Sequence, residues 1–278
     1  MTPRIHMETA SATDPGVVRS FNEDSIAIEN DLGLLILADG MGGYKAGDVA
    51  SSLATSLILE EIKRRLGQQT ASPLRKLNQL TESSLTVKTA IEKTNRFIHN
   101  TAQTSDKHHG MGTTIVLILF HDGWATIAHV GDSRLYRLRH GELELLTHDH
   151  SLLQEQVELG MISTEEAKFS HNRNLVTRAL GVEAEVNVDV REVDVLPDDI
   201  YLLCTDGLND MVDDSNIELA LRELQVNLPL AANQLIEMAN DNGGHDNISV
   251  VIAKLSNGMK RTHTLRDKLF GWLSIFKG

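Results

Sequence analysis

Apolar residues of this chain gather in short runs that are separated by turn residues. Runs of this length, rich in leucine and β-branched side chains and bounded by Gly, Asp, Asn or Pro, are typical of buried β-strands. They predict strands at Ser25–Glu29, Leu34–Ala38, Thr113–Phe120, Trp124–Val130, Arg134–Arg139, Asp199–Cys204 and Ile248–Lys254. The tight turns His121-Asp122-Gly123 and Arg139-His140-Gly141 indicate hairpins, because glycine supplies a positive φ there.

Longer segments repeat apolar residues at helical spacing, as Leu53 and Leu57 do within the first of them. Ser72-Pro73 provides a start for the second, since proline suits the first helical position. The spacing predicts helices at Ala46–Leu66, Leu74–Thr104, Ser151–Leu159, Asp214–Leu224 and Leu228–Asn240. Strands joined as hairpins and interrupted by paired helices favour an α+β fold with antiparallel sheets over a doubly wound parallel sheet.

Composition excludes several classes of protein. The chain has 278 residues, 41% of them hydrophobic and 23% charged, which is ordinary for a globular protein that needs no disulfides. A net charge of −13 argues against a nucleic-acid partner. The single cysteine, Cys204, excludes an intramolecular disulfide and fits a reducing cytoplasm. The longest apolar runs, Leu32–Ala38 and Ile115–Phe120, are too short to span a bilayer, so a cytoplasmic protein is expected.

Two predicted strands end in the pair Asp-Gly, at Asp39-Gly40 and Asp206-Gly207. Either pair alone is most often a turn. A carboxylate at the end of a buried strand, however, is costly unless it is paired or bound to a metal. Further acidic segments flank strands at Arg19–Asp24, Gly131–Arg134 and Gly243–Asn247. Carboxylates gathered from distant strands suit Mg²⁺ or Mn²⁺, whereas zinc is disfavoured because the only Cys lies in a strand and no His pair has ligand spacing.

The order of these motifs resembles a known family, the metal-dependent protein phosphatases of type 2C, in its bacterial branch. The resemblance covers roughly residues 8–254. It rests on Thr13-Asp14-x-Gly16-x-x-Arg19-x-x-Asn22-Glu23-Asp24, Ala38-Asp39-Gly40-Met41-Gly42-Gly43, Gly112-Thr113-Thr114, His129-Val130-Gly131-Asp132-Ser133-Arg134, Thr205-Asp206-Gly207 and Gly244-His245-Asp246-Asn247.

The resemblance implies a fold and a metal site. The fold is a four-layer α-β-β-α sandwich of two antiparallel sheets flanked by helices, formed by residues 1–256, with the site at one end. Asp39 would bridge two Mn²⁺ or Mg²⁺ ions, and Asp132 would help hold a third, weaker ion. Asp24 would orient metal-bound waters. The implied metal ligands are Glu23 (through water), Asp39, Gly40 (through its carbonyl), Asp132, Asp206 and Asp246.

The resemblance also implies an activity, the hydrolysis of phosphoserine and phosphothreonine monoesters on proteins by a metal-activated water, opposing a Ser/Thr kinase. Arg19 would hold the phosphate oxygens, a task for which a planar guanidinium is suited. The implied catalytic residues are Arg19, Asp39, Asp206 and Tyr44. Two alternatives are a catalytically weak phosphoprotein-binding module and a small-molecule phosphate monoesterase. A complete set of carboxylates favours an active enzyme, expected as a monomer.

The proton donor is where the sequence departs from the family. Tyr44 stands where many bacterial members have histidine. A phenol can donate a proton, but with a pKa near 10 it is a different acid from imidazole. Three donors stay open: Tyr44, a metal-bound water, or another histidine, either His171 or His245. A cysteine mechanism is disfavoured, because the residue six positions after Cys204 is Asp210 and not the arginine that such enzymes use.

Two segments are candidates for partner recognition. Residues 151–181 resemble the family's flap, a subdomain beside the active site that influences substrate access. Residues 257–278 form a basic tail with Leu265, Leu269, Trp272, Leu273 and Phe276 on one helical stripe. Packing on its own domain or fraying is the first expectation for this amphipathic tail. Docking to a partner comes second, and contact with a membrane third.

Overall fold

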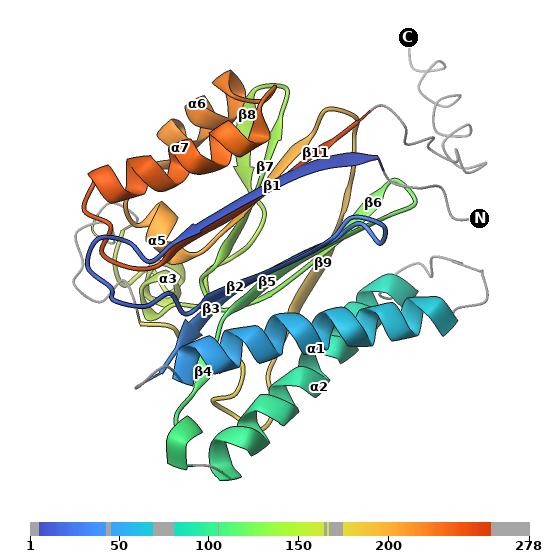
Figure 1. The fold of residues 1–278 in the computed structure, drawn as a ribbon, viewed down its shortest axis with the longest axis vertical. Coiled ribbons are helices and arrows are strands. Elements are labelled where there is room, and N and C mark those ends of the chain that lie inside the picture. Colours follow the sequence, from blue (N-terminus) through green and yellow to red (C-terminus); the bar gives the residue numbers. More distant parts are fainter. Residues whose placement is uncertain are drawn as a thin grey trace.

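The strands form two antiparallel sheets in a computed structural model, which describes residues 6–42, 46–68, 81–104, 106–163, 166 and 175–256 (Figure 1). The first sheet has the order β1-β11-β10-β7-β8. Its members are β1 (Met7–Asp14), β11 (Ile248–Leu255), β10 (Ile200–Cys204), β7 (Arg134–Arg139) and β8 (Glu142–Leu145). The second has the order β2-β3-β5-β6-β9, with β4 paired to β3. Its members are β2 (Asp24–Glu29), β3 (Leu34–Met41), β4 (Gly112–Thr113), β5 (Ile115–His121), β6 (Trp124–Val130) and β9 (Asp189–Asp194).

Helices cover the outer face of each sheet. Helices α1 (Ala46–Gln68) and α2 (Glu82–Thr104) lie on the sheet that contains β3, and α6 (Asp214–Glu223) and α7 (Leu228–Asp241) lie on the sheet that contains β11 (Figure 1). Shorter helical segments are η1 (Asp106–His108), α3 (Leu152–Glu158) and α5 (Asp206–Asn209). The expected α-β-β-α sandwich is therefore confirmed.

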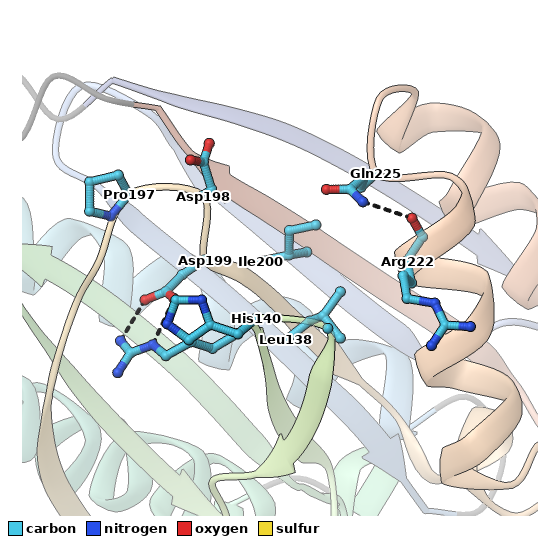
Figure 2. Close-up of a pocket in the computed structure, with 10 residues that line it drawn as sticks. Leu138, His140, Pro197, Asp198, Asp199, Ile200, Arg222 and Gln225 are labelled. Atoms are coloured by element: carbon cyan, nitrogen blue, oxygen red, sulfur yellow. Dashed lines mark hydrogen bonds and ion pairs between the residues drawn. The ribbon is translucent and has the colours of Figure 1, made fainter.

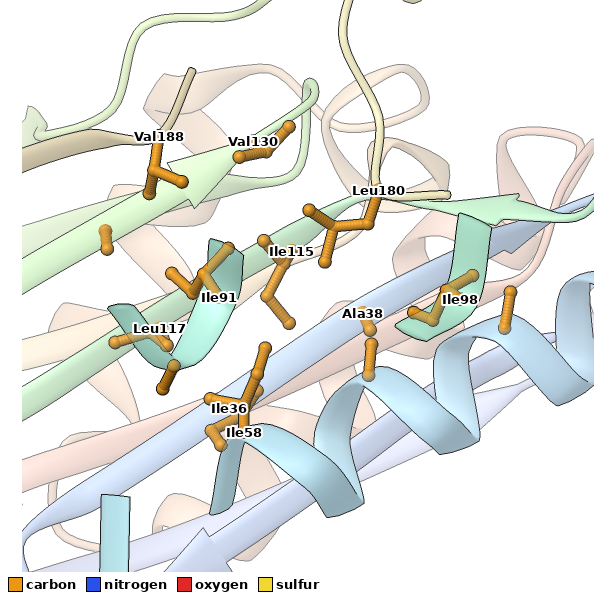
Figure 3. Packing of buried hydrophobic residues seen from close by; sticks show 14 of the residues in the cluster. Ile36, Ala38, Ile58, Ile91, Ile98, Ile115, Leu117, Val130, Leu180 and Val188 are labelled. Carbon is orange, nitrogen blue, oxygen red and sulfur yellow. The ribbon is translucent and has the colours of Figure 1, made fainter. Parts of the chain in front are cut away.

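Alternation along buried strands explains the four layers. In β3, Leu34 and Ile36 belong to the core under α1 and α2, whereas Leu35 and Leu37 belong to the core between the two sheets. Both faces of the strand are apolar because both are covered. Figure 3 shows Ile36 beside Ile58 of α1. Successive side chains of a strand point to opposite faces, so one apolar run serves two cores.

The strand ends that carry the predicted site residues lie at one end of the sandwich. Antiparallel pairing places Asp24, at the start of β2, opposite Asp39, near the end of β3. In the other sheet, Cys204 at the end of β10 pairs with Val250 of β11. The opposite end of the sandwich holds a separate cavity of about 170 Å³. Asp198, Arg222 and Gln225 are among the residues that line it (Figure 2).

Most predicted elements are confirmed, with instructive differences. The expected strand at Thr113–Phe120 is split, because Thr114 leaves the ladder to bind Asp39. Strands β1, β8 and β9 were not predicted, and all three are edge strands with polar residues. The predicted helix Leu74–Thr104 is wrong at Thr81, which precedes α2 and accepts the Ser84 N–H with its side chain. The expected helix start at Leu74 and the tail 257–278 lie outside the described residues. Within the described residues, no helix combines the length and the apolar character needed to cross a membrane.

Candidate metal centre

Asp39 lies where the apolar run of β3 gives way to glycine. Its carbonyl oxygen accepts hydrogen bonds from Thr114 N–H and Thr113 Oγ1, both at 2.8 Å. Its own N–H donates to Thr114 Oγ1 at 3.2 Å. Withdrawal of the carboxyl group from water, followed by repulsion from Asp24 and Asp206, raises the pKa of Asp39 well above its usual value. The backbone of Asp39 is therefore fixed by hydrogen bonds, whereas burial and the neighbouring aspartates disfavour a negative charge on its side chain.

Gly40 allows two backbone segments to approach β3 closely. A Cβ atom at this position would lie 2.3 Å from the carbonyl oxygen of Gly47 and 2.4 Å from that of Glu23. The N–H of Gly40 donates to the Glu23 carbonyl at 3.2 Å, and Ser51 Oγ of α1 donates to the same oxygen at 2.6 Å. The start of α1 and the entry to β2 therefore meet at Gly40, which a residue with a side chain would prevent.

Glu23 and Asp24 join the two sheets. Glu23 N–H donates to Asn247 Oδ1 at 2.8 Å. Asp24 Oδ2 accepts hydrogen bonds from Ser249 Oγ at 2.6 Å and Thr205 Oγ1 at 3.2 Å; Ser249 belongs to β11 of the opposite sheet and Thr205 follows the end of β10. Burial, only partly offset by these bonds, raises the pKa of Asp24 to about 7. Glu23 Oε1 and Asp24 Oδ1 are buried without a hydrogen-bond partner in the described part of the chain.

Asp206 is the first residue of α5, and only Thr205 separates it from the end of β10. Burial raises the pKa of its carboxyl group well above the usual value, and repulsion from Asp132 and Asp210 adds to this effect. Its Oδ1 atom has no hydrogen-bond partner among the described residues. Asp210 N–H donates to the Asp206 carbonyl at 2.8 Å, so both aspartates belong to one helical turn. Asp210 was not predicted from the sequence, although its four-residue spacing from Asp206 places the two on one helix face.

Asp132 lies in the short connection between β6 and β7 and is only 7% exposed. Its pKa rises to about 6, first because of burial and then because of repulsion from Asp149. Asp210 contributes to the same shift, which places Asp132 in the same electrostatic group as Asp206. We call this group the acid cluster, consisting of Glu23, Asp24, Asp39, Asp132, Asp206, Asp210 and Asp246.

Arg19 and Asp246, which were predicted to bind phosphate and metal respectively, form an ion pair. Arg19 Nη2 lies 2.7 Å from Asp246 Oδ2, with 55% and 32% of the two side chains exposed. The pair lines a cavity of about 260 Å³ together with Gly207, Asp210, Met211 and His245. Arg19 thus lies at the mouth of the acid cluster. His245 lines the same cavity, whereas Tyr44 and His171 lie outside the described residues.

The chemistry of the acid cluster fits divalent cations. Buried carboxylates that repel each other and raise each other's pKa need protons or cations to offset their charge. The three buried oxygens without hydrogen-bond partners, on Glu23, Asp24 and Asp206, are unused acceptors. The cluster is open, because no three of its described carboxylates have oxygens within 4.8 Å of one another. Mg²⁺ and Mn²⁺ suit such a site, since hard cations keep several waters.

Comparison with known proteins identifies the family. The family model described as "Protein phosphatase 2C" matches residues 17–238. The serine/threonine phosphatase Stp of Listeria monocytogenes is 37% identical over 251 residues, covering 89% of this chain and 96% of that protein. The crystal structure of the serine/threonine phosphatase Stp1 from Staphylococcus aureus matches with a TM-score of 0.81 at 32% identity, covering 92% of this chain and 98% of that one.

A third relative bears on the metal. The catalytic domain of the serine/threonine protein phosphatase PstP, in complex with two manganese ions, matches with a TM-score of 0.73 at 36% identity, covering 90% of this chain and 99% of that one. The chain belongs to the protein phosphatase 2C family.

Proposed function

We propose that the acid cluster is the catalytic centre of this phosphatase and holds two Mn²⁺ or Mg²⁺ ions. The family makes the chain a metal-dependent protein serine/threonine phosphatase that acts on phosphoproteins. What supports the location is a set of buried carboxylates with unused oxygens at one end of the sandwich. Asp39, Asp206 and Asp246 would hold the two ions, together with Glu23 through water and the Gly40 carbonyl. Asp132, with Asp210 beside it, would hold a third, weaker ion.

Divalent cations, when bound, would offset the charge of the phosphate and lower the pKa of a water molecule. The protein residues around them have separate tasks. Asp24 would orient water through its free oxygen, because its other oxygen is already held by Ser249 and Thr205. The threonines at positions 113 and 114 would keep the backbone of Asp39 fixed.

Arg19 would bind the phosphate oxygens that are not transferred. A guanidinium carries five N–H donors, so its contact with Asp246 through Nη2 is compatible with a second ligand. Its position at the mouth of the cavity, with more than half of the side chain exposed, lets a phosphorylated side chain reach it. Replacing Arg19 by lysine would keep the charge but lose bidentate binding.

The proton for the leaving alkoxide has three candidate sources: Tyr44, a water bound at the centre, and a histidine. His245 is supported by its place in the cavity beside Asp246. Tyr44→Phe and His245→Gln, compared across pH, would separate these sources. A donor is identified by loss of the basic limb of the pH–rate profile in its variant.

Substrate choice would depend on the flap, residues 151–181, and on the basic tail, residues 257–278. We infer that the substrates are proteins phosphorylated by a cognate Ser/Thr kinase and that the catalytic domain, residues 1–256, acts as a monomer. Small-molecule monoesters would meet the same acid cluster but would make no contact with the flap. They should therefore be poorer substrates.

The direct test is the release of phosphate from a phosphothreonine peptide and from p-nitrophenyl phosphate, with Mn²⁺ and with a chelator. Asp206→Asn should lower turnover by about 10²-fold or more on both substrates, because a ligand oxygen loses its charge. Asp198→Asn makes the same chemical change in an exposed residue at the opposite end of the sandwich and should leave turnover unchanged.

Two results would contradict the proposal. Retained Mn²⁺-dependent turnover in Asp206→Asn would move the catalytic centre away from the acid cluster. Faster turnover of the small monoester than of the peptide, measured as kcat/KM, would remove the preference for proteins.

A further inference from the structure

The loop that carries Asp132 is held from behind by one buried histidine. His150 is only 2% exposed and binds both backbone groups of Gly131. Gly131 N–H donates to the ring Nδ1 of His150 at 3.1 Å, and the backbone N–H of His150 donates to the Gly131 carbonyl at 3.0 Å. These two bonds fix the backbone of Gly131, the residue immediately before Asp132.

Gly131 is held equally closely on its other side. Its φ is +110°, and a Cβ atom would lie 2.5 Å from the Thr114 Cβ, so the backbone is packed directly against that threonine. Thr114 Oγ1 lies 2.7 Å from Ser133 Oγ, one residue after Asp132, and accepts the N–H of Asp39. The loop therefore lies between His150 and a threonine that also fixes Asp39.

The same histidine contacts both ends of the flap. Its carbonyl oxygen accepts a hydrogen bond from Thr177 N–H at 2.8 Å, and the next residue, Ser151, forms a bridge with Val176. Its Nε2 atom lies 3.4 Å from Asp189 Oδ2, and Asp189 Oδ1 accepts a bond from Arg178 at 3.1 Å. The flap thus leaves the sandwich directly after His150 and returns alongside it.

A metal site is a different interpretation of the same residues. Donor atoms of His129, His150 and Asp189 lie within 4.8 Å of one another. The two imidazoles, however, are stacked, with ring centroids 4.7 Å apart and an interplanar angle of 21°, so their lone pairs do not converge on one point. A metal at His150 Nε2 would also require a proton on Nδ1, where the Gly131 N–H already points. The geometry favours two imidazoles that hydrogen-bond separately to the backbone, His150 at Gly131 and His129 at His148.

The charge state of His150 agrees with this interpretation. Burial, followed by repulsion from His129 and Arg178, lowers its pKa to about 4. The ring is therefore neutral around pH 7, and Nδ1 keeps the lone pair that accepts the Gly131 N–H. His129 donates from Nε2 to the His148 carbonyl at 2.8 Å, which holds the stacked ring in place.

We propose that His150 is a positioning residue that couples the flap to the cation-binding loop of Asp132. Its Nδ1 half fixes Gly131 and hence Asp132. Its backbone carbonyl binds the returning flap segment at Thr177, and its Nε2 atom lies beside Asp189. This inference rests on the proposed function only in that Asp132 is taken as a cation ligand. A partner or substrate that shifts the flap would, through His150, change how firmly Asp132 holds its ion.

Two substitutions separate the halves of the imidazole. His150→Asn keeps an acceptor near the position of Nδ1 and loses the Nε2 end, whereas His150→Gln keeps a polar group near Nε2 and loses the Nδ1 acceptor. We expect His150→Gln to weaken the weakest Mn²⁺ binding step by about tenfold, as the loss of a group that supports a metal ligand typically does. We expect His150→Asn to bind Mn²⁺ as the unmodified protein does. Mn²⁺ binding is measured by isothermal titration and by the paramagnetic resonance of free Mn²⁺, independently of turnover.

Asp189→Asn tests the flap side. It removes the charge next to Nε2 and Arg178 without touching Gly131. We expect an increased KM for a phosphothreonine peptide and a weakening of the same Mn²⁺ step that is smaller than in His150→Gln, because the ring keeps its Nδ1 contact with Gly131 but loses its charged neighbour on the flap side. Unchanged Mn²⁺ affinity in Asp189→Asn would show that the flap side is not coupled to Asp132. Equal losses of Mn²⁺ affinity in His150→Asn and His150→Gln would show a merely structural role and overturn the proposal, as would unchanged affinity in His150→Gln.

Two further measurements separate a failure of the proposed function from a failure of this inference. Asp132→Asn should weaken the same Mn²⁺ binding step, and an unchanged step would show that Asp132 is not a cation ligand. A weakened step in Asp132→Asn together with an unchanged step in His150→Gln would show that His150 does not position Asp132. Should His150→Gln not fold, amide hydrogen exchange of the unmodified protein decides: Gly131 N–H should be protected as well as the core amides of β6. Fast exchange there would overturn the proposal.

Discussion

Burial raises the pKa of two residues at the end of β10, but it leaves only one of them in need of a counter-charge. Cys204 is fully buried, and burial raises the pKa of its thiol to about 12. Asp206, two residues later, is also removed from water, but it has an unpartnered oxygen and acidic neighbours. A buried thiol packs as a small apolar group at little energetic cost, whereas a buried carboxylate needs a counter-charge. The same strand end thus carries one buried group that needs no counter-charge and one that does.

The inertness of Cys204 can be tested directly. Because the thiolate is the nucleophile, a buried thiol with a raised pKa should not react with a thiol reagent in the native protein. We expect no release of the chromophore from Ellman's reagent at pH 8 with native protein and one equivalent in denaturant. Reaction of the native protein within minutes would show that β10 opens readily and that Cys204 is accessible.

The sequence predicted some site residues and not others for a physical reason. Asp39 and Asp206 each lie within two residues of the end of an apolar run, so their placement is a local property of the chain. Asp210 carries only a weak local signal, the spacing of one helical turn. The contact between Gly131 and His150 spans 19 residues and depends on how two strands and the flap pack, which no local pattern encodes.

At the scale of elements, α1 shows how closely a helix can lie on a sheet. Its buried face carries small residues, Ala46, Ala50 and Ala54, before the larger Ile58 and Ile62. The small residues bring the start of the helix close to β3, where Gly47 and Gly40 meet. Close packing at the start of α1 therefore helps to set the position of the site backbone.

Overfilling this contact should be costly. Ala54→Leu adds three carbon atoms to a fully buried position, and such overpacking costs about 1–3 kcal/mol. Ser56→Leu, on the exposed side of the same helix, should change stability by less than about 0.5 kcal/mol. Urea unfolding followed by circular dichroism measures both. Equal effects of the two substitutions would mean that α1 is not packed on β3 as described.

Edge strands account for most of what the sequence did not predict among the elements. Central strands such as β3 and β5 are apolar on both faces and give continuous runs. Strands β1, β8 and β9 lie at sheet edges and mix polar with apolar residues, so they lack that signal. Helix boundaries were predicted to within a few residues where caps are clear, as at Asn227 before α7.

At the scale of the whole molecule, the two sheets meet through polar contacts at the site end. Asp24 on one sheet is bound by Thr205 and Ser249 on the other, while apolar side chains fill the space between the sheets elsewhere. The acid cluster is therefore part of the junction between the two halves of the sandwich. Its charge state should influence the stability of the whole fold.

The metal-free protein should lose stability as pH rises. The pKa of Asp24 is raised from 3.8 to about 7 in the folded state, so the folded protein binds more protons than the unfolded chain between these values. Stability from this group is present below pH 3.8 and is lost as pH rises through about 7, at up to about 1.4 kcal/mol per pH unit for one proton. Burial lowers the pKa of His129 and His150, and these two groups make stability rise with pH. The contribution of Asp24 is therefore measured as the difference in stability between the unmodified protein and a variant without the carboxyl group.

The measurement is thermal unfolding in a chelator from pH 5 to pH 8.5, for the unmodified protein and for Asp24→Asn. Since Asn cannot ionise, the unmodified protein should fall progressively below Asp24→Asn as pH rises, and the difference should flatten above pH 7.5. Added Mn²⁺ should reverse the trend for the unmodified protein, because cations replace protons as the counter-charge of the acid cluster. A difference between the two proteins that does not change with pH would mean that Asp24 is ionised throughout, and that its burial is relieved in solution.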